Sequence, residues 1–493
     1  MSFNKMSLNK TFLNKGLFNK IPNSLKNMLI YAVSIFLVKG MSLIMLPIVA
    51  QFLSPAQLGK LELLATTTVF LSLLVGFAMH ENLYRFVGEL KCKIEQFNKV
   101  SELYTYAVLL SLIVATLVTV LLFMLPSLKS IFTSTDIALL CIVLGFESAL
   151  GISMAWLRFQ DRANVFFVIS VLSSVLQVSA VIFVLYTAPV VTYIYAIGVL
   201  TGVFQLVILH RVNQFTWVWA GLKNLKSLLK YSIPLMLSTL VAFGLTGAEK
   251  WIIGYSFSIE VLGLYSVAAK FSLAMCILIQ PFSMWWMPKR FNALMYQGKS
   301  YTTQVTQCGL VYISILTITV ASASQIFIAW TLPQAYITAT ELLSGVILIA
   351  LFKELSDLVN IGILQHKKTQ LILMINSACT VGGLGLCWAL VGYGVWGIIV
   401  SIAIAQVTRA TLILYFSQRL IKLPYQYSAI LLILINTLSC LALSFFNQHP
   451  LWLILIALFG AIFNLAVAYR FKFLDAFELP NLSRYFPSVI RGL

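Results

Sequence analysis

The chain has 493 residues, of which 60% are hydrophobic and only 10% are charged. A soluble globular domain carries about 25% charged residues, so this composition excludes a soluble cytosolic enzyme. The formal net charge of +18 is expected to mark the side of a membrane on which loops lie and to attract anionic lipid. It does not indicate nucleic acid as a partner.

Apolar runs of about 20 residues recur along the chain, and each is long enough to cross a hydrocarbon core of about 30 Å. Because lipid offers no hydrogen-bond partners, such runs must be helices that satisfy their own backbone groups. We therefore predict an all-α polytopic membrane protein. Runs bounded by charge, Pro or Gly give fourteen transmembrane helices: 29–52, 60–79, 103–126, 137–157, 164–186, 189–210, 231–253, 261–284, 307–330, 340–364, 370–391, 394–416, 427–446 and 450–470.

Basic residues gather in the two tails and in every second loop, as with Lys367 and Lys368 after the tenth predicted helix. The remaining loops hold only Lys60 and Lys129. Since Lys and Arg concentrate on the cytoplasmic side of a membrane, both termini are predicted to be cytoplasmic.

An internal repeat relates the two halves of the chain. At a shift of about 205 residues, Leu58-Gly59 aligns with Leu262-Gly263, and Arg85-Phe86 aligns with Arg290-Phe291. Loop chemistry can recur by chance, but similar shifts at separated places favour a true repeat. Six helices are an even number, so both copies have the same orientation, and we predict a pseudo-two-fold axis along the membrane normal with a cavity between two lobes.

These patterns predict an organisation in six parts. They are a basic cytoplasmic tail (1–27), a first lobe of six helices (28–211), a cytoplasmic linker (212–230), a second lobe (231–417), two extra helices (427–470) and a cytoplasmic tail (471–493). The seven cysteines contain no C-x-x-C pair and the four histidines are scattered. No metal site is predicted.

Several short stretches resemble a known family. Leu53–Gly59 followed by Arg85–Glu89 is similar to the first helix hairpin of polysaccharide flippases in the multidrug/oligosaccharidyl-lipid/polysaccharide exporter superfamily. Lys230–Leu235, Leu262–Ala268 and Pro288–Phe291 resemble the seventh and eighth helices of that family in order and spacing. The resemblance covers almost the whole chain.

The resemblance implies a flippase that moves an undecaprenyl-diphosphate-linked sugar repeat unit across a bacterial inner membrane, for O-antigen, capsule or exopolysaccharide synthesis. It implies lipid-linked oligosaccharide and membrane lipid as partners, together with polymerase and chain-length proteins of the same pathway. In such families the last two helices are associated with a groove for the lipid tail. Relatives commonly carry Asp-Arg where this chain has Glu249-Lys250, and Lys cannot make the bidentate contacts of Arg.

Ionisable residues inside the membrane are the candidate functional residues, because each costs at least about 2.5–3.5 kcal/mol and should face a partner or a wet cavity. A diphosphate needs cations that make charge-assisted hydrogen bonds. The predicted headgroup ligands are Lys39, Lys250, Lys270, Lys353 and Arg409. Buried carboxylates can carry a coupling proton or sodium ion, and the predicted candidates are Glu147, Glu249, Glu354 and Asp357.

Pairing between helices is the alternative for each of these residues. Lys353 and Asp357 stand four residues apart and can pair on one helix face. Lys39 and Lys270 have no acid at helical spacing, so they are the preferred headgroup ligands. We expect these residues to converge on one polar centre between the lobes.

Three other functions are open to such a chain. A cation-coupled drug or metabolite antiporter would share the two lobes, but it typically has twelve helices and an acidic cavity. A peptidoglycan-precursor flippase handles the same diphosphate chemistry. A membrane enzyme is disfavoured, because the predicted external loops are short and nearly uncharged and no nucleotide-binding motif is present. No resident cofactor is predicted beyond a coupling H⁺ or Na⁺.

Overall fold

The computed structural model describes residues 23–124, 131–287, 289–447 and 449–477. Residues 1–22 of the predicted N-terminal tail and residues 478–493 of the predicted C-terminal tail lie outside the described residues, as does Lys129. Within the described part every regular element is a helix, which confirms the predicted fold class.

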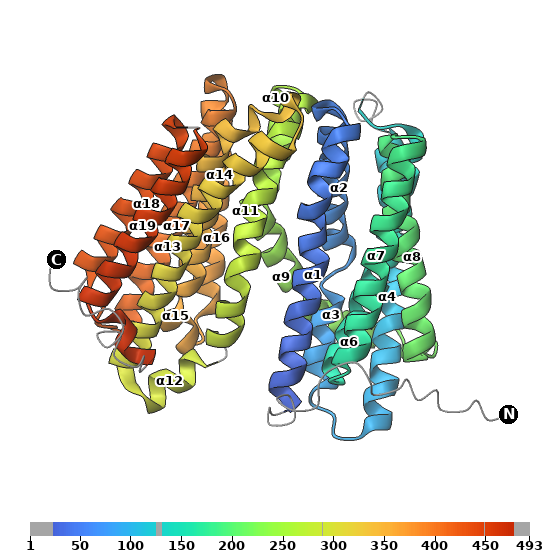
Figure 1. Cartoon of the computed structure of the whole chain (residues 1–493). Helices are drawn as coiled ribbons and strands as arrows, with labels where there is room; N and C mark the ends of the chain where they lie inside the picture. The colour runs from blue at the N-terminus through green and yellow to red at the C-terminus, as the bar shows by residue number, and fades with distance from the viewer. Residues whose placement is uncertain (1–22, 125–130, 288, 448, 478–493) are drawn as a thin grey trace, which may run out of the picture.

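The first half of the chain forms one lobe (Figure 1). Its elements are α1 (Asn23–Phe52), α2 (Pro55–Val75), α3 (Met79–Asn82), the π-helix η2 (Leu83–Val87), α4 (Lys93–Met124), α6 (Ser134–Phe159), α7 (Ala163–Thr187) and α8 (Val191–Asn213).

The second half forms a second lobe, on which the last two long helices pack through α13. Its elements are α9 (Leu222–Phe243), α10 (Ala248–Ser256), α11 (Ile259–Trp286), α12 (Arg290–Tyr296), α13 (Gly298–Thr331), η3 (Gln334–Tyr336), α14 (Ala339–Leu358), α15 (Ile361–Gln365), α16 (Thr369–Leu390), η4 (Val391–Tyr393) and α17 (Val395–Leu420). They are followed by α18 (Tyr427–Phe446), α19 (Pro450–Arg470) and η5 (Phe473–Phe477).

Twelve described helices are long and apolar enough to span a membrane, or thirteen if α9 and α10 are one span. The predicted count of fourteen also includes α14, a 20-residue helix packed between α11, α13 and α17. Helix α14 is not among the twelve, because it carries four charged residues within 20 residues: Glu341, Lys353, Glu354 and Asp357. The count of fourteen therefore stays a prediction.

Two predicted helices are interrupted. The helix predicted at 231–253 bends by 46° between α9 and α10. The break follows Phe243, whereas α9 continues through Pro234. The helix predicted at 340–364 ends at Leu358 and is followed by the short α15.

The long helices alternate in direction, so the bundle has two ends. We call the end that holds the start of α1, α12 and η5 the basic end, because the Lys- and Arg-rich loops lie there (Figure 1). At the opposite end Lys60 pairs with Asp136 (Nζ–Oδ2 2.8 Å), so the charge of this lysine is compensated.

Candidate functional site: the interface between the lobes

The lobes touch most closely at the opposite end, where the first turns of α2 and α11 cross. A Cβ added to Gly59 would lie 1.9 Å from the carbonyl oxygen of Ile259, and one added to Gly263 would lie 1.9 Å from that of Pro55. Only glycine allows backbones to approach so closely. The two glycines are the residues that the predicted repeat aligns, and their contacts are reciprocal.

A carboxylate joins the lobes one turn deeper. Glu62 of α2 accepts hydrogen bonds from Lys250 of α10 (Nζ–Oε2 3.1 Å) and from Lys270 of α11. The Glu62 side chain is only 13% exposed, so these contacts form largely away from water. We call the glycine contact and this glutamate bridge the lobe seal.

This bridge corrects the expectation that Lys270 is unpaired. The acid comes from the other lobe, so spacing along α11 could not reveal it. Glu249 of α10 turns elsewhere and accepts a hydrogen bond from the hydroxyl of Tyr265 (3.3 Å). Its second carboxylate oxygen has no hydrogen-bond partner among the described residues.

A second contact region between the lobes encloses a cavity of about 270 Å³. Lys39 of α1 lines it from the first lobe, and Lys353, Glu354 and Asp357 of α14 line it from the second. We call it the basic cavity. It lies toward the basic end of α11, since Ser283 and Met287 also line it.

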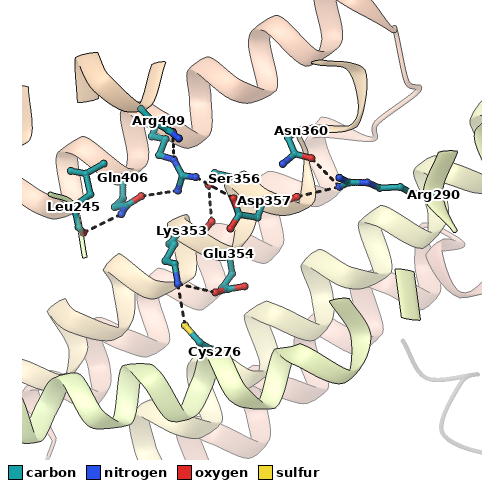
Figure 2. A network of polar contacts seen from close by, with 11 residues as sticks. Leu245, Cys276, Arg290, Lys353, Glu354, Ser356, Asp357, Asn360, Gln406 and Arg409 are labelled. Atoms are coloured by element: carbon teal, nitrogen blue, oxygen red, sulfur yellow. Dashed lines mark hydrogen bonds and ion pairs between the residues drawn. The ribbon is translucent and has the colours of Figure 1, made fainter. Parts of the chain in front are cut away.

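The three charges of α14 that line the basic cavity are paired, but not as their spacing predicted (Figure 2). Lys353 lies 3.5 Å from Glu354 and its ammonium also contacts the Cys276 sulfur at 3.9 Å. Asp357 accepts a hydrogen bond from Arg409 of α17 (3.1 Å) in place of Lys353. Lys39 is exposed to the cavity and has no ion pair within the described ranges.

Arg409 is held in a network that joins several helices of the second lobe (Figure 2). It donates to Asn376 of α16 (2.8 Å) and to Gln406 (3.4 Å). Gln406 in turn donates to the carbonyl oxygen of Leu245, which lies at the break between α9 and α10. The network therefore connects the break between α9 and α10 to Asp357, which lines the basic cavity.

A larger cavity of about 480 Å³ lies between α2, α3 and α6 of the first lobe and α9 of the second. Glu147 of α6 lines it, with hydroxyl groups from Thr68, Ser72, Ser148 and Ser238. Glu147 has no ion pair or hydrogen bond to any residue in the described part of the chain. It is the one predicted coupling carboxylate in this cavity.

An apolar groove runs between α13, α14, α17 and α18. Its cavity measures about 130 Å³, and Leu358 lines both this groove and the basic cavity. Tyr425 lines the groove and is buried, which raises the pKa of its hydroxyl well above the usual range. A hydrophobic surface thus adjoins the basic cavity.

The predicted residues consequently form three groups and not a single centre. Lys39, Lys353, Glu354 and Asp357 share the basic cavity, and Arg409 reaches it through Asp357. Lys250 and Lys270 belong to the lobe seal, with Glu249 close by on α10. Glu147 lies in the hydroxyl-lined cavity. The roles assigned to these residues stay predictions.

Glu62 is the central residue that the sequence analysis missed. Helix α2 was predicted to begin at residue 60, which would place Glu62 at the membrane surface. It begins at Pro55, after Ser54 and Gln57 form a capping box. That motif, together with Pro at the first helical position, is a sequence signal that could have located the start.

Comparison with known families gives a match to the model for "Polysaccharide biosynthesis protein" over residues 24–291, which is more than half of the chain. The chain belongs to the polysaccharide biosynthesis protein family. A comparison with curated protein sequences gave no match.

Solved structures show that this polysaccharide biosynthesis protein has the fold of transporters in the multidrug/oligosaccharidyl-lipid/polysaccharide exporter superfamily. The lipid II flippase MurJ in an inward closed conformation aligns with a TM-score of 0.65 at 14% identity, covering 95% of this chain and 99% of MurJ. An inward-facing multidrug resistance transporter of the MATE family aligns with a TM-score of 0.54 at 16% identity, covering 81% and 95%. A superfamily transporter from Pyrococcus furiosus aligns with a TM-score of 0.51 at 16% identity, covering 81% and 96%.

Proposed function

We propose that this protein is a flippase that moves undecaprenyl-diphosphate-linked oligosaccharide repeat units across a bacterial inner membrane. Both termini would face the cytoplasm, and the lobes would alternate between openings on the two sides. The product would serve O-antigen, capsule or exopolysaccharide synthesis, alongside the polymerase and chain-length proteins of that pathway.

The observation that carries this proposal is the junction of the basic cavity with the apolar groove at Leu358. A lipid-linked diphosphate has a doubly charged head joined to a hydrocarbon tail, so it needs these two environments side by side. Lys39 would contact the diphosphate first, because it has no ion pair to give up within the described residues. Lys353 and Arg409 would follow by exchanging carboxylate partners for phosphate.

The two contact regions suggest how the cycle would work. With the lobe seal intact at the opposite end, the head would enter the basic cavity from the basic end. Opening the seal would require Glu62 to leave Lys250 and Lys270. Released lysines could then meet the diphosphate on its way out, so the seal residues would serve the substrate in the second half of the cycle.

Coupling to an ion is part of this proposal. Glu147 is the strongest candidate for a coupling proton or sodium ion, since no described residue neutralises it. Glu249 is the next, because one of its oxygens has no hydrogen-bond partner. Glu354 and Asp357 are already paired with cations. Translocation by the unaltered protein should respond to a proton or sodium gradient, and translocation by Glu147→Gln should not.

A peptidoglycan-precursor flippase is the second candidate function. The alignment to MurJ over 95% of this chain favours it, and its substrate also carries a lipid-linked diphosphate. A cation-coupled drug antiporter fits less well, because the basic cavity presents Lys39 and Lys353 to the ligand.

Reconstituted vesicles would test the proposal. Purified protein is incorporated with fluorescent undecaprenyl-diphosphate-linked oligosaccharide, and the fraction that reaches the far leaflet is measured with a membrane-impermeant quencher. We expect faster translocation than in protein-free vesicles, and slower translocation of fluorescent lipid II. Faster movement of lipid II would favour the second candidate, and no movement of either would contradict both.

A further inference from the structure

The first lobe contains a cavity of its own, of about 360 Å³, between α1, α6, α7 and α8. Lys39 lines this cavity and also the basic cavity, so the two spaces meet at its side chain. The volume falls in the range of about 300–1,000 Å³ typical of small-molecule sites. We call it the serine cavity. Its polar lining includes Lys39, Ser34, Ser170, Ser173, Gln177 and Thr201.

Two hydroxyl groups of the residues that line the serine cavity have no partner among the described residues. Ser170 and Ser173 of α7 are 7% and 6% exposed, and neither Oγ forms a hydrogen bond to the described part of the chain. Hydroxyls inside helices usually bond to the carbonyl four residues earlier. Ser34 and Thr201, on the same wall, do so with Ile30 (2.6 Å) and Ile197 (2.8 Å). A buried hydroxyl without a partner is unfavourable, and such groups occur elsewhere in the described part of the chain. Ser170 and Ser173 differ in that both line a cavity, where hydroxyl groups of a ligand would be their partners.

The chemistry of the wall selects the kind of ligand. No carboxylate of the described ranges lines the serine cavity, and the amide groups of Gln177 and Gln205 add both donors and acceptors to the serine hydroxyls. Phe166 and Met154 contribute an apolar surface. Apart from Lys39, the wall is uncharged, and its mixed donors and acceptors beside an apolar patch suit a sugar ring, which presents hydroxyl groups at its edge and C–H groups on its face.

We propose that the serine cavity holds the sugar attached directly to the diphosphate, while Lys39 contacts the adjacent phosphate. This inference rests on the proposed function and assigns a place to the first sugar. Ser170 and Ser173 then donate to and accept from sugar hydroxyls, and the exposed amide of Gln177 completes the contacts. The three environments follow the order of the ligand: apolar groove, basic cavity, serine cavity.

Binding of two kinds of lipid to the purified full chain in detergent tests this assignment. The first is undecaprenyl diphosphate, and the second is a panel in which it carries glucose, galactose or N-acetylglucosamine. We expect at least one sugar to tighten binding about tenfold over the bare diphosphate, as one or two good hydrogen bonds would. The double variant Ser170→Ala/Ser173→Ala should lose that gain and keep its affinity for undecaprenyl diphosphate.

Stability separates this role from a structural one. Removing hydroxyls that have no partner should leave the thermal midpoint unchanged or raise it. Ser322→Ala in α13 is the matched control, because Ser322 is 2% exposed, has an unpartnered Oγ and lines none of the four cavities described. It should leave both affinities unchanged.

Three results would overturn the assignment. The first is that no sugar of the panel improves on undecaprenyl diphosphate, which would mean that the cavity holds water alone. The second is that the serine variant weakens both lipids equally, and the third is that it keeps the full sugar-dependent gain. If the unaltered protein bound neither kind of lipid, the proposed function itself would fail, which is a distinguishable outcome.

Discussion

The lobe seal and the basic cavity lie in the same interface and have opposite chemistry. In the seal, glycine backbones touch and the one carboxylate of Glu62 pairs with two lysines, largely away from solvent. In the basic cavity Lys39 has no ion pair within the described residues, and Lys353 is 35% exposed. The difference shows that a lysine within the membrane can be assigned to ligand binding only after an acid on the other lobe has been looked for: Lys270 has one, and Lys39 has none among the described residues.

The glycine contact is the part of the seal that should tolerate substitution least, because backbone atoms of the two lobes meet there. Gly59→Leu places a side chain where even a Cβ would overlap the carbonyl oxygen of Ile259. Because backbone cannot yield as a side chain can, the seal should not form, and translocation in vesicles should fall to the protein-free level. Gly385→Ala is the control, since nothing lies within 4 Å of that position. Normal translocation by Gly59→Leu would show that the lobes need not meet there.

The glutamate bridge gives the next largest effect. Glu62→Gln leaves Lys250 and Lys270 without a carboxylate, and breaking a buried ion pair in this way costs about 3–5 kcal/mol. Lys250→Met leaves one lysine for one carboxylate and should cost far less. The thermal midpoint in detergent should therefore drop more for Glu62→Gln than for Lys250→Met.

Lys60→Met is the control for Glu62→Gln, because it also breaks an ion pair of α2 but lies outside the lobe seal. It breaks the ion pair with Asp136 inside the first lobe and leaves the lobe seal intact. Cross-linking between cysteines placed on α2 and α11 should stay efficient in Lys60→Met and decrease in Glu62→Gln. Equal cross-linking in both would remove Glu62 from the seal.

The smallest effect concerns the cavity. Glu354→Gln removes the carboxylate that lies 3.5 Å from Lys353. Partly exposed ion pairs contribute up to about 1 kcal/mol, so freeing Lys353 should tighten binding of undecaprenyl diphosphate about threefold. Binding measured at low and high salt should show the gain mainly at low salt. Weaker binding by this variant would mean that Glu354 positions Lys353 for the ligand.

The sequence predicted the helical fold and the repeat because both depend on patterns that persist over many residues. Apolar length and loop charge fix the spans, and the alignment of Leu58-Gly59 with Leu262-Gly263 identified equivalent positions. That the two glycines touch each other could not be predicted, since a repeat defines equivalence and not which equivalent residues lie at the interface.

The candidate site was less predictable for the same reason. Partners such as Glu62 and Lys270 come from helices far apart in the chain, and helical spacing detects only partners on one helix. Lys353 and Asp357 have the spacing of a pair, yet each binds a different residue because Arg409 lies closer to Asp357. The unpartnered hydroxyls of Ser170 and Ser173 carry no sequence signal, because serines at helical spacing are common in packed helices.

The affinity of undecaprenyl diphosphate for Lys39→Ala and for Lys270→Ala, each compared with the unaltered protein, tests the division between cavity and seal most directly. We predict that Lys39→Ala weakens binding at least about tenfold, because it removes the one cavity lysine with no ion pair in the described ranges. Lys270→Ala should bind within about twofold of the unaltered protein, since its ammonium is held by Glu62. Unchanged binding by Lys39→Ala, or an equal loss in both variants, would contradict the account.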